Sequence, residues 1–519
     1  MTITIDSNRR TPRAAFKLSE CLGSQRCYWL FLAIYLIAHI ALRLWETPNI
    51  GKNEVQEAIA AQGWAWGYHP RNPPLHTWLL MGSYGLFGAN VLAHTVLKYV
   101  LLGALYAFAY LSGRRLLKSP ALAALSALSL MLLGPFAWTV HTAWTHTLLL
   151  AVSVFATFWA ALRLDANRRL TDYLLFGVMI GAGLLAKYSF LLFLGPLLAA
   201  MAITLQTRSV LFDRRMLASL ALAAVLIAPH AIWMATAKFD FAHFLAEVEH
   251  IDDDHSYVMD LALGFGDVAY EALAFLFPFA LIFPVLFRKS FTKALTAPSG
   301  WGTVATLVPA LSFGLLALNI FAFRATNYEV RYMLCALLLA PLAAFMWLER
   351  REHSERAFAW LTGWLVAIAV IGLGALTARA EFYHSSCRRC YDEMPIERLV
   401  SELRNSGFGR GTIVTPDYYI GGNMRLAFPA ARVIATNYYV QHPPVVGAGQ
   451  CLLVWDARIE GDAIPESVAQ YLQHTGVTPT GAPRYVEALL HRDRERRDRF
   501  AYWPVENADA NCRPVSSRP

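Results

Sequence analysis

The chain has 519 residues, of which 56% are hydrophobic and only 16% are charged, and its mean hydropathy is +0.39. Soluble domains carry about 25% charged residues, so this composition excludes an ordinary soluble enzyme. The formal net charge of +8 does not indicate nucleic-acid binding, because the basic residues stand in short clusters between apolar runs. Several runs approach the roughly 20 residues that a helix needs to cross a bilayer. We therefore predict a polytopic α-helical membrane protein.

Residues 1–27 are polar and basic, and no small-residue cleavage pattern follows the first apolar run, so we expect an uncleaved first helix. The apolar stretch 172–205 is too long for one crossing at about 1.5 Å per residue, so it is divided at Lys187. Eleven transmembrane helices are then predicted. Their approximate ranges are 28–45, 91–111, 120–139, 147–164, 172–186, 188–205, 216–234, 266–287, 300–322, 332–348 and 357–378.

The distribution of basic residues predicts the orientation in the membrane. One set of connections, which includes the N-terminus, holds twenty Lys and Arg residues, and the opposite set holds six. Cytoplasmic loops carry the excess of Lys and Arg. The N-terminal segment is therefore predicted to be cytoplasmic, whereas the loop 46–90 and everything after about residue 379 lie on the outer side.

The loop 46–90 separates the first two predicted spans and is rich in polar and aromatic residues. Its first half can be drawn as an amphipathic helix, with Val55, Ile59 and Trp66 at roughly helical spacing. Three prolines around residues 70–74 then break that helix. A polar and aromatic segment at the mouth of a membrane protein is suited to chemistry on an amphiphile, so we expect the active site in this loop.

The segment 379–519 changes in composition. Short β-rich runs bounded by Gly and Pro alternate with helix-like stretches, which predicts a small α/β domain. Four cysteines lie in it, and an even number in an oxidising compartment favours disulfides over a zinc site, because CRRC has no second CxxC or HxxxH nearby. These disulfide candidates are Cys387, Cys390, Cys451 and Cys512. The other three cysteines, Cys21, Cys27 and Cys335, lie in or near spans and are expected to be inert.

Seven segments carry a resemblance to a known family. They are NEVQEAIAAQGWAWGYHPRNPPLHTWLL, GRRLL, THTLLL, GLLAKYSFLLFLGPLL, APHAIW, NYEVRYMLCALLLAPL and YYIGGNMRLAFPAARVIATN with CLLVWD. In this order they resemble the GT-C glycosyltransferases of the protein-mannosyltransferase and aminoarabinose-transferase superfamily, and the last resembles the periplasmic C-terminal domain of a bacterial subgroup. The resemblance covers about residues 28–460. It implies a GT-C transmembrane domain at 28–378 and a periplasmic α/β domain at 379–519.

The resemblance also implies an activity, which is sugar transfer at the outer face of a bacterial inner membrane. The donor is a sugar linked to polyprenyl phosphate, and the acceptor is a lipid, a glycan or a protein; no nucleic acid takes part. An acceptor hydroxyl attacks the anomeric carbon, and polyprenyl phosphate leaves. No cofactor is implied with certainty, and the sequence allows a divalent cation without favouring one.

The resemblance places the catalytic carboxylate at the start of the amphipathic helix. Glu54 matches the Glu of the family's Asp-Glu pair, and Asn53 stands where the family has the Asp. This departure leaves Glu54, or Glu57 one helical turn later, as the candidate base or acceptor-orienting group. Alternatively, Glu54 is a solvated carboxylate favoured by the helix dipole, and Asn53 is an N-cap.

Other polar residues near the outer side are candidates for binding the donor. They are Lys187, Tyr188, Arg71, His69, Arg331, His146 and His141. An ionisable residue inside an apolar stretch is functional by default, so we expect Lys187 to bind the donor phosphate. Alternatively, Lys187 snorkels to the membrane surface and only marks the turn. Arg71 suits a phosphate or a lipid headgroup equally. His141 and His146 are five residues apart, which is not one helix face, and no acidic residue lies between positions 134 and 164, so no metal site is predicted.

Two other functions fit a membrane protein of this kind. One is a transporter or flippase for a lipid-linked saccharide, against which stand the absence of internal sequence repeats and of paired Gly/Pro-broken spans. The other is a lapsed relative that binds glycans without turnover, which Asn53 allows.

Overall fold

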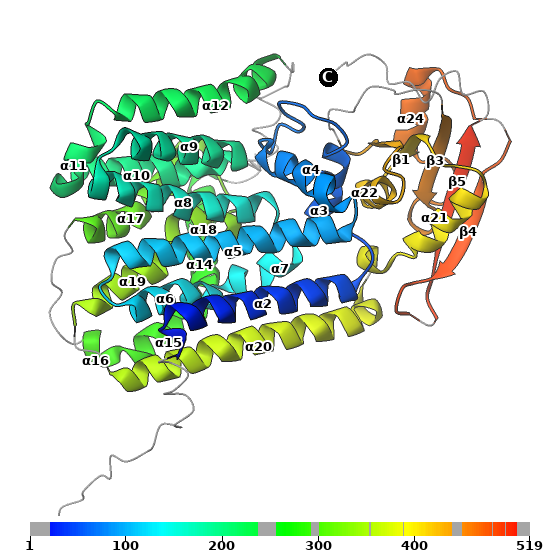
Figure 1. Ribbon diagram of the computed structural model, residues 1–519. Coiled ribbons are helices and arrows are strands. Elements are labelled where there is room, and N and C mark those ends of the chain that lie inside the picture. Colours follow the sequence, from blue (N-terminus) through cyan, green and yellow to red (C-terminus); the bar gives the residue numbers. More distant parts are fainter. Residues whose placement is uncertain are drawn as a thin grey trace, which may run out of the picture.

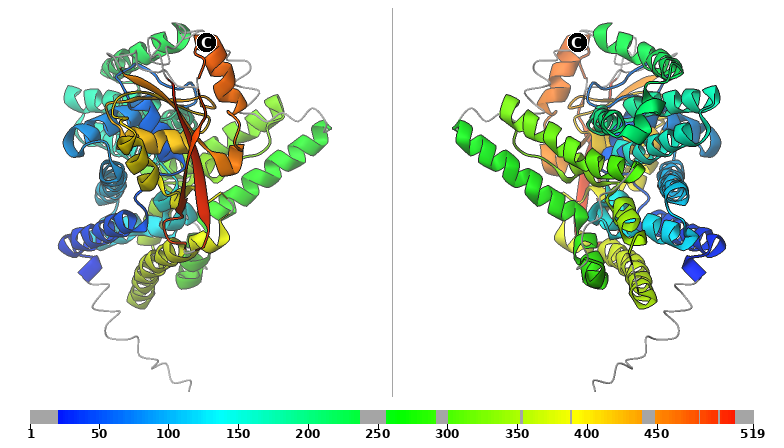
Figure 2. Two further views of the ribbon diagram at one scale, coloured as in Figure 1. Left: turned by 90° about the vertical axis from the view of Figure 1, so that its right-hand side faces the viewer. Right: turned by 90° about the vertical axis from the view of Figure 1, so that its left-hand side faces the viewer.

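The structure is a computed structural model, and it describes residues 21–236, 256–291, 300–351, 354–387, 389–438, 449–479, 481–493 and 495–505. Long helices form a bundle, and a β-sheet with its own helices lies at one end of that bundle (Figure 1). Seen from that end, the sheet stands in front of the bundle (Figure 2, left). Most of the predicted N-terminal segment 1–27, and Cys512, lie outside the described residues.

The bundle is organised around α8, whose most apolar stretch is 89% buried. Helices α5 and α9 pack against it. The long helices of the bundle are α2 (Gln25–Glu46), α5 (Val91–Leu116), α8 (His146–Asn167), α9 (Leu170–Ala186), α10 (Leu191–Ile203), α12 (Met216–Thr236), α14 (Tyr257–Leu276), α17 (Trp301–Phe323) and α20 (Glu355–Ser386). The shorter ones are α6 (Pro120–Leu128), η1 (Ser129–Leu132), η2 (Pro135–Thr139), α7 (Val140–Thr142), η3 (Tyr188–Phe190), α11 (Leu205–Leu211), α15 (Phe279–Leu286), α16 (Arg288–Phe291), α18 (Val330–Leu337) and α19 (Ala340–Glu349).

Seven helical stretches among the described residues are long and apolar enough to cross a membrane, and an eighth counts if η3–α10 and α11, bent by 115°, are one span. The protein is therefore a polytopic membrane protein. Several of the eleven predicted spans are shorter or interrupted, among them 332–348, which divides into α18 and α19. The range 120–139 divides into α6, η1 and η2, and α9 has only 17 residues. The predicted span 266–287 is wrong in its bounds, because Pro278 cannot continue the helical hydrogen bonding and separates α14 from α15.

The loop between α2 and α5 folds into two short helices, α3 (Asn53–Ala60) and α4 (Leu75–Phe87). The sequence analysis extended the first helix to Trp66, and this is wrong. The helix ends at Ala60, the side-chain amide of Gln62 donates to the Val433 carbonyl, and Trp66 packs edge-on against Trp78 of α4. Helices α3 and α4 lie at the end of the bundle that faces the sheet (Figure 1).

The segment after α20 contains a five-stranded sheet in the order β2-β1-β3-β5-β4. Its strands are β1 (Gly411–Thr415), β2 (Arg432–Ala435), β3 (Gln450–Asp456), β4 (Arg484–Leu489) and β5 (Arg497–Val505). Strand β1 is parallel to β2 and β3, whereas β5 is antiparallel to β3 and β4. The helical elements are η4 (Tyr391–Glu393), α21 (Ile396–Asn405), α22 (Tyr418–Ala427), α23 (Ala457–Glu460) and α24 (Glu466–Thr475).

Alternating side chains divide the core of this segment into two layers. Ile413 and Leu452 point to the face covered by α21 and α22, and they belong to a cluster with Leu399. Val414 and Leu453 point to the opposite face, which α24 covers. The sheet is therefore buried on both faces, as expected of an α/β arrangement.

Helix α3 is fixed to this segment by close packing and by two side-chain amides. A Cβ added to Gly422 of α22 would lie 2.6 Å from the Cα of Val55 in α3. The Asn423 amide donates to the Ile50 carbonyl (3.0 Å) and accepts from its N–H (2.9 Å). The Gln62 amide donates to the Val433 carbonyl of β2 (2.9 Å), and the Val433 N–H donates to its oxygen (2.7 Å).

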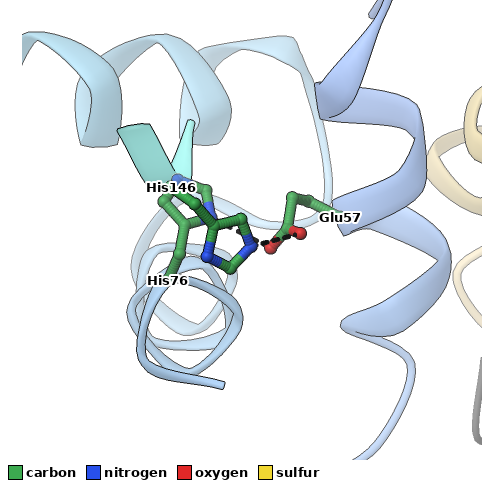
Figure 3. A group of neighbouring side chains, drawn as sticks. All are labelled: Glu57, His76 and His146. Atoms are coloured by element: carbon green, nitrogen blue, oxygen red, sulfur yellow. Dashed lines mark hydrogen bonds and ion pairs between the residues drawn. The ribbon is translucent and has the colours of Figure 1, made fainter. Parts of the chain in front are cut away.

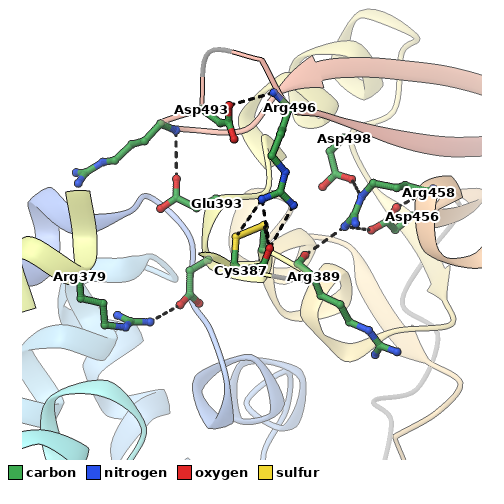
Figure 4. Close-up of a disulfide and its surroundings, with 12 residues drawn as sticks. Arg379, Cys387, Arg389, Glu393, Asp456, Arg458, Asp493, Arg496 and Asp498 are labelled. Atoms are coloured by element: carbon green, nitrogen blue, oxygen red, sulfur yellow. Dashed lines mark hydrogen bonds and ion pairs between the residues drawn. A yellow bond between two sulfur atoms is a disulfide. The ribbon is translucent and has the colours of Figure 1, made fainter. Parts of the chain in front are cut away.

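Disulfides are present near the start of the described chain and directly after α20. Cys387 is bonded to Cys390 directly after α20, and the guanidinium of Arg496 donates to the Cys387 carbonyl (Figure 4). Cys451 is also disulfide-bonded. The expectation that Cys21 and Cys27 are inert is wrong, because they form a disulfide. Cys335 is a buried free thiol.

The close approach of α22 to α3 generates a prediction. Gly422→Ala would force its Cβ against the Val55 backbone, so the substitution should destabilise the folded protein by about 1–3 kcal/mol. The matched control is Gly363→Ala in α20, whose added Cβ meets no atom within 4 Å. Thermal unfolding of the detergent-solubilised variants should show a lower midpoint for Gly422→Ala alone. Equal midpoints would contradict this packing.

Candidate active site

Two buried carboxylates on α3 form the centre of the candidate site. Glu54 and Glu57 lie one turn apart, and their exposed fractions are 6% and 5%. Carboxylates at this depth are unfavourable unless each is paired with a positive or hydrogen-bonding partner. The two residues take their partners from different helices, so they form two adjacent subsites.

The Glu54 subsite is an ion-paired cluster supplied by the first two long helices. Lys98 of α5 donates to Oε1 of Glu54 (2.6 Å), and Arg43 of α2 donates to Oε2 (3.2 Å). Arg43 also donates to the carbonyls of Thr47 and Asn49, which fixes the chain between α2 and α3. Burial alone raises the pKa of the Glu54 carboxyl, but the charges of Lys98 and Arg43 outweigh it and hold that pKa well below its usual range. Glu54 is therefore ionised.

A small cavity of about 20 Å³ lies beside Glu54, large enough for one water molecule. Its lining is unusually charged, with Lys52 and Arg379 beside Glu46 and Asp392. Arg379 at the end of α20 pairs with both of these acids. The backbone of Lys52 has a φ of 47°, a region that residues other than glycine seldom occupy and that occurs preferentially at functional sites.

The Glu57 subsite joins a carboxylate to two imidazoles (Figure 3). Nδ1 of His76, on α4, lies 2.9 Å from Oε2 of Glu57, and Nε2 of His146, on α8, lies 2.7 Å from Oε1. The hydroxyl of Thr77 also donates to Oε2 (2.9 Å). All three side chains are buried, and their ligand atoms lie within 4.8 Å of one another, so this set could hold a metal ion.

The predicted donor residue Lys187 lies close to this subsite, in the turn between α9 and η3. Its Nζ donates to the hydroxyl of Thr147 (2.8 Å), next to His146, while Nδ1 of His146 lies 3.3 Å from the Ala186 carbonyl. Burial, followed by the charge of Arg331, lowers the pKa of the Lys187 ammonium to about 8. Arg331 itself is 41% exposed in its side chain and pairs with Glu329.

Tyr188 links the Lys187 turn to the loop between α2 and α5. Its hydroxyl donates to Nε2 of His230 in α12 (2.9 Å), and Nδ1 of His230 donates to the Trp66 carbonyl (2.8 Å). This chain of hydrogen bonds connects α12, the Lys187 turn and the loop. Tyr188 is thus a bridging residue in the described structure.

The remaining sequence-predicted residues lie apart from the two subsites or only at their edge. His141 lies between the hydroxyls of Tyr35 (2.9 Å) and Tyr99 (3.2 Å), although it also borders the Glu54 cavity. His69 stacks on Tyr438 in a separate turn, where its Nδ1 accepts from the Arg71 N–H (3.0 Å).

Asn53 is the first residue of α3, and Lys52 occupies the N-cap position, so the alternative reading of Asn53 as an N-cap is wrong. The Asn53 amide instead donates to the Ala143 carbonyl (3.0 Å), which ties α3 to the turn before α8.

Three residues of the site were missed by the sequence analysis. Arg43 and Lys98 could have been found by the criterion that selected Lys187, since both are basic residues inside predicted spans. His76 gives no comparable signal, because nothing in the local pattern relates it to Glu57 or to His146.

Comparisons with known proteins agree with this architecture. The family model described as dolichyl-phosphate-mannose-protein mannosyltransferase matches residues 71–233. The lipopolysaccharide core galacturonosyltransferase RgtB of Rhizobium johnstonii is 27% identical over 458 residues, which cover 86% of this chain and 90% of RgtB. RgtA of the same organism is 28% identical over 465 residues, which cover 86% of this chain and 91% of RgtA.

A solved structure shares the fold. It is that of ArnT from Cupriavidus metallidurans bound to undecaprenyl phosphate, with a TM-score of 0.56 and 15% identity, covering 94% of this chain and 99% of that one. Together, these comparisons show that the chain is similar to the membrane glycosyltransferases RgtA and RgtB over most of its length and that it shares the fold of ArnT.

Proposed function

We propose that the protein transfers a sugar from a polyprenyl-phosphate-linked donor to an acceptor at the periplasmic face of a bacterial inner membrane. The names of RgtA and RgtB support a glycan of the lipopolysaccharide type as the acceptor, and the lipid bound to ArnT supports a polyprenyl phosphate carrier. The observation that carries the proposal is the buried, ionised Glu54 between Lys98 and Arg43, at the bundle end that the charge distribution predicts to be outside the cytoplasm.

In this reaction an acceptor hydroxyl attacks the anomeric carbon, the new glycosidic bond forms, and the bond from that carbon to the phosphate oxygen breaks. The proton of the hydroxyl passes to the departing phosphate. Glu54 accepts a hydrogen bond from the attacking hydroxyl and orients it. Its two ion pairs weaken it as a proton acceptor but keep it charged and fixed in position, which is what orientation requires. The neighbouring Asn53 is neutral and anchors the helix that carries Glu54.

The leaving polyprenyl phosphate needs cationic partners as its charge develops. Lys187 is the first of these, and Arg331, whose charge acts on Lys187, is the second. The cavity beside Glu54 is too small for a sugar phosphate in this state, so donor binding requires lining side chains to move. Lys52 is exposed and in a strained backbone conformation, which makes it the first candidate for such a movement.

The role of Glu54 can be separated from its contribution to folding. Glu54→Gln should lower the release of polyprenyl phosphate, measured on purified protein with polyprenyl-phosphate sugars and a lipopolysaccharide acceptor, by about 10²–10⁴-fold. Because that variant leaves Lys98 buried beside a neutral amide, the double variant Glu54→Gln/Lys98→Met serves as its control. The double variant should regain thermal stability without regaining turnover. Recovered turnover would show that Glu54 is only a structural counter-ion.

The buried ammonium of Lys187 predicts a pH dependence. Its protonated form binds phosphate, so donor affinity should be highest below about pH 8 and should fall as the pH rises through that value. Lys187→Arg should retain affinity at pH 9, because a guanidinium stays charged.

The neutral variant of Lys187 tests the same contact by another route. Lys187→Met should raise the KM for the donor about 10–100-fold below about pH 8, the amount expected for one charge-assisted hydrogen bond, and the difference from wild type should shrink above that pH. Lys118→Met, at an exposed Lys in the turn after α5, provides the matched control and should leave KM unchanged. An unchanged KM in Lys187→Met would remove Lys187 from the donor site.

A further inference from the structure

We propose that Glu57, His76 and His146 bind a first-row divalent metal ion, for which Zn²⁺ is the best fit. The inference rests on the geometry of these three side chains and not on the function proposed above. Their ligand atoms, one from each residue, lie within 4.8 Å of one another, and all three residues are buried. The exposed fractions of Glu57, His76 and His146 are between 4% and 5%.

The short contact between His146 and Glu57 accommodates either a proton or a metal ion. Nδ1 of His146 lies 3.3 Å from the Ala186 carbonyl, which can only accept, so Nδ1 carries a hydrogen. In a neutral imidazole, Nε2 then presents a lone pair, and it points at Oε1 of the Glu57 carboxylate at 2.7 Å. Two acceptors at this distance repel each other unless a proton or a metal ion lies between them.

The surroundings favour a metal ion over a single shared proton. Metal-bound histidines typically donate their second ring N–H to a backbone carbonyl, which is the arrangement of His146 with Ala186. Metal-bound carboxylates are in turn held by hydrogen bonds, as Thr77 holds Oε2 of Glu57. The second imidazole, that of His76, converges on the same carboxylate from another helix. One imidazole is enough to share a proton with a carboxylate, whereas two imidazoles that converge on one carboxylate match the ligands of a metal site.

The donor set indicates the class of metal. Two imidazole nitrogens and one carboxylate oxygen suit Zn²⁺ and neighbouring first-row ions, whereas Mg²⁺ and Ca²⁺ prefer oxygen ligands alone. Bonds of about 2.0–2.1 Å to a tetrahedral ion place ligand atoms about 3.3 Å apart. The nitrogen–oxygen distances of 2.7 and 2.9 Å run to the two different oxygens of Glu57 and need to lengthen by about half an ångström, whereas any pair of ligand atoms near the 4.8 Å limit needs to shorten. Three protein ligands leave a fourth position for water.

The proposed ion would fasten three helices together at the site. Glu57 is on α3, His76 on α4 and His146 on α8 (Figure 3). Glu54 lies one turn before Glu57, so a metal ion that fixes Glu57 also fixes the direction in which Glu54 points. The ion is therefore assigned a positioning role for α3.

Metal content and stability test the proposal without an activity assay. Wild-type protein purified without chelator should contain about one zinc per chain, and removal of the metal should lower the midpoint of thermal unfolding. Added Zn²⁺ should restore the midpoint, and Mg²⁺ should not. Protein reloaded with Co²⁺ should show the visible absorption of a four-coordinate site. These measurements need no substitution, so they do not depend on whether a variant folds.

Substitutions then test the ligands. Glu57→Gln and His146→Gln should each lose the zinc and the response of the unfolding midpoint to Zn²⁺. His141→Gln is the matched control, because it removes a buried histidine of the same turn that bonds to two tyrosines and should keep the zinc. Absence of metal from the wild type together with no response to Zn²⁺ would overturn the proposal, as would zinc at the wild-type level in His146→Gln. Loss of turnover with zinc retained would count against the proposed function alone.

Discussion

The burial of two carboxylates on a single short helix is the constraint on which the rest of the site depends. Neither Glu54 nor Glu57 can remain charged inside the protein without partners, and an eight-residue helix supplies none of them itself. Glu54 takes its partners from α2 and α5, and Glu57 takes them from α4 and α8. The ends of four helices therefore meet at α3. Electrostatic pairing therefore acts there together with the apolar packing of Val55 and Ile59.

Helix α3 is also too short to be stable alone, because helices below about 12 residues are marginal in water. Its remaining support comes from the segment after α20, through the packing of α22 on Val55 and the amides of Gln62 and Asn423. The loop and the sheet segment are thus ordered together. This arrangement holds Glu54 and Glu57 between the helical bundle and the sheet segment.

The sequence predicts the elements of this structure better than it predicts their contacts. Hydropathy locates the helices that cross the membrane, because burial in lipid needs a long apolar run, and it fails at Pro278, where one run is two helices. The resemblance directs attention to the loop that carries Glu54. The pairing of Glu57 with His146, 89 positions away, could not be predicted, since helical periodicity describes one helix and not which helices meet. The same reason explains why His76 was missed.

The contact between Gln62 and Val433 also limits association between copies of the chain. Strand β2 lies at the border of the sheet, where unpaired backbone groups would attract a strand from another chain. At that border the amide of Gln62 accepts a hydrogen bond from the Val433 N–H and donates one to the Val433 carbonyl, much as an adjoining strand would. A side chain that secures the loop between α2 and α5 thereby also covers part of this edge of the sheet, so damage to the loop would be expected to promote aggregation.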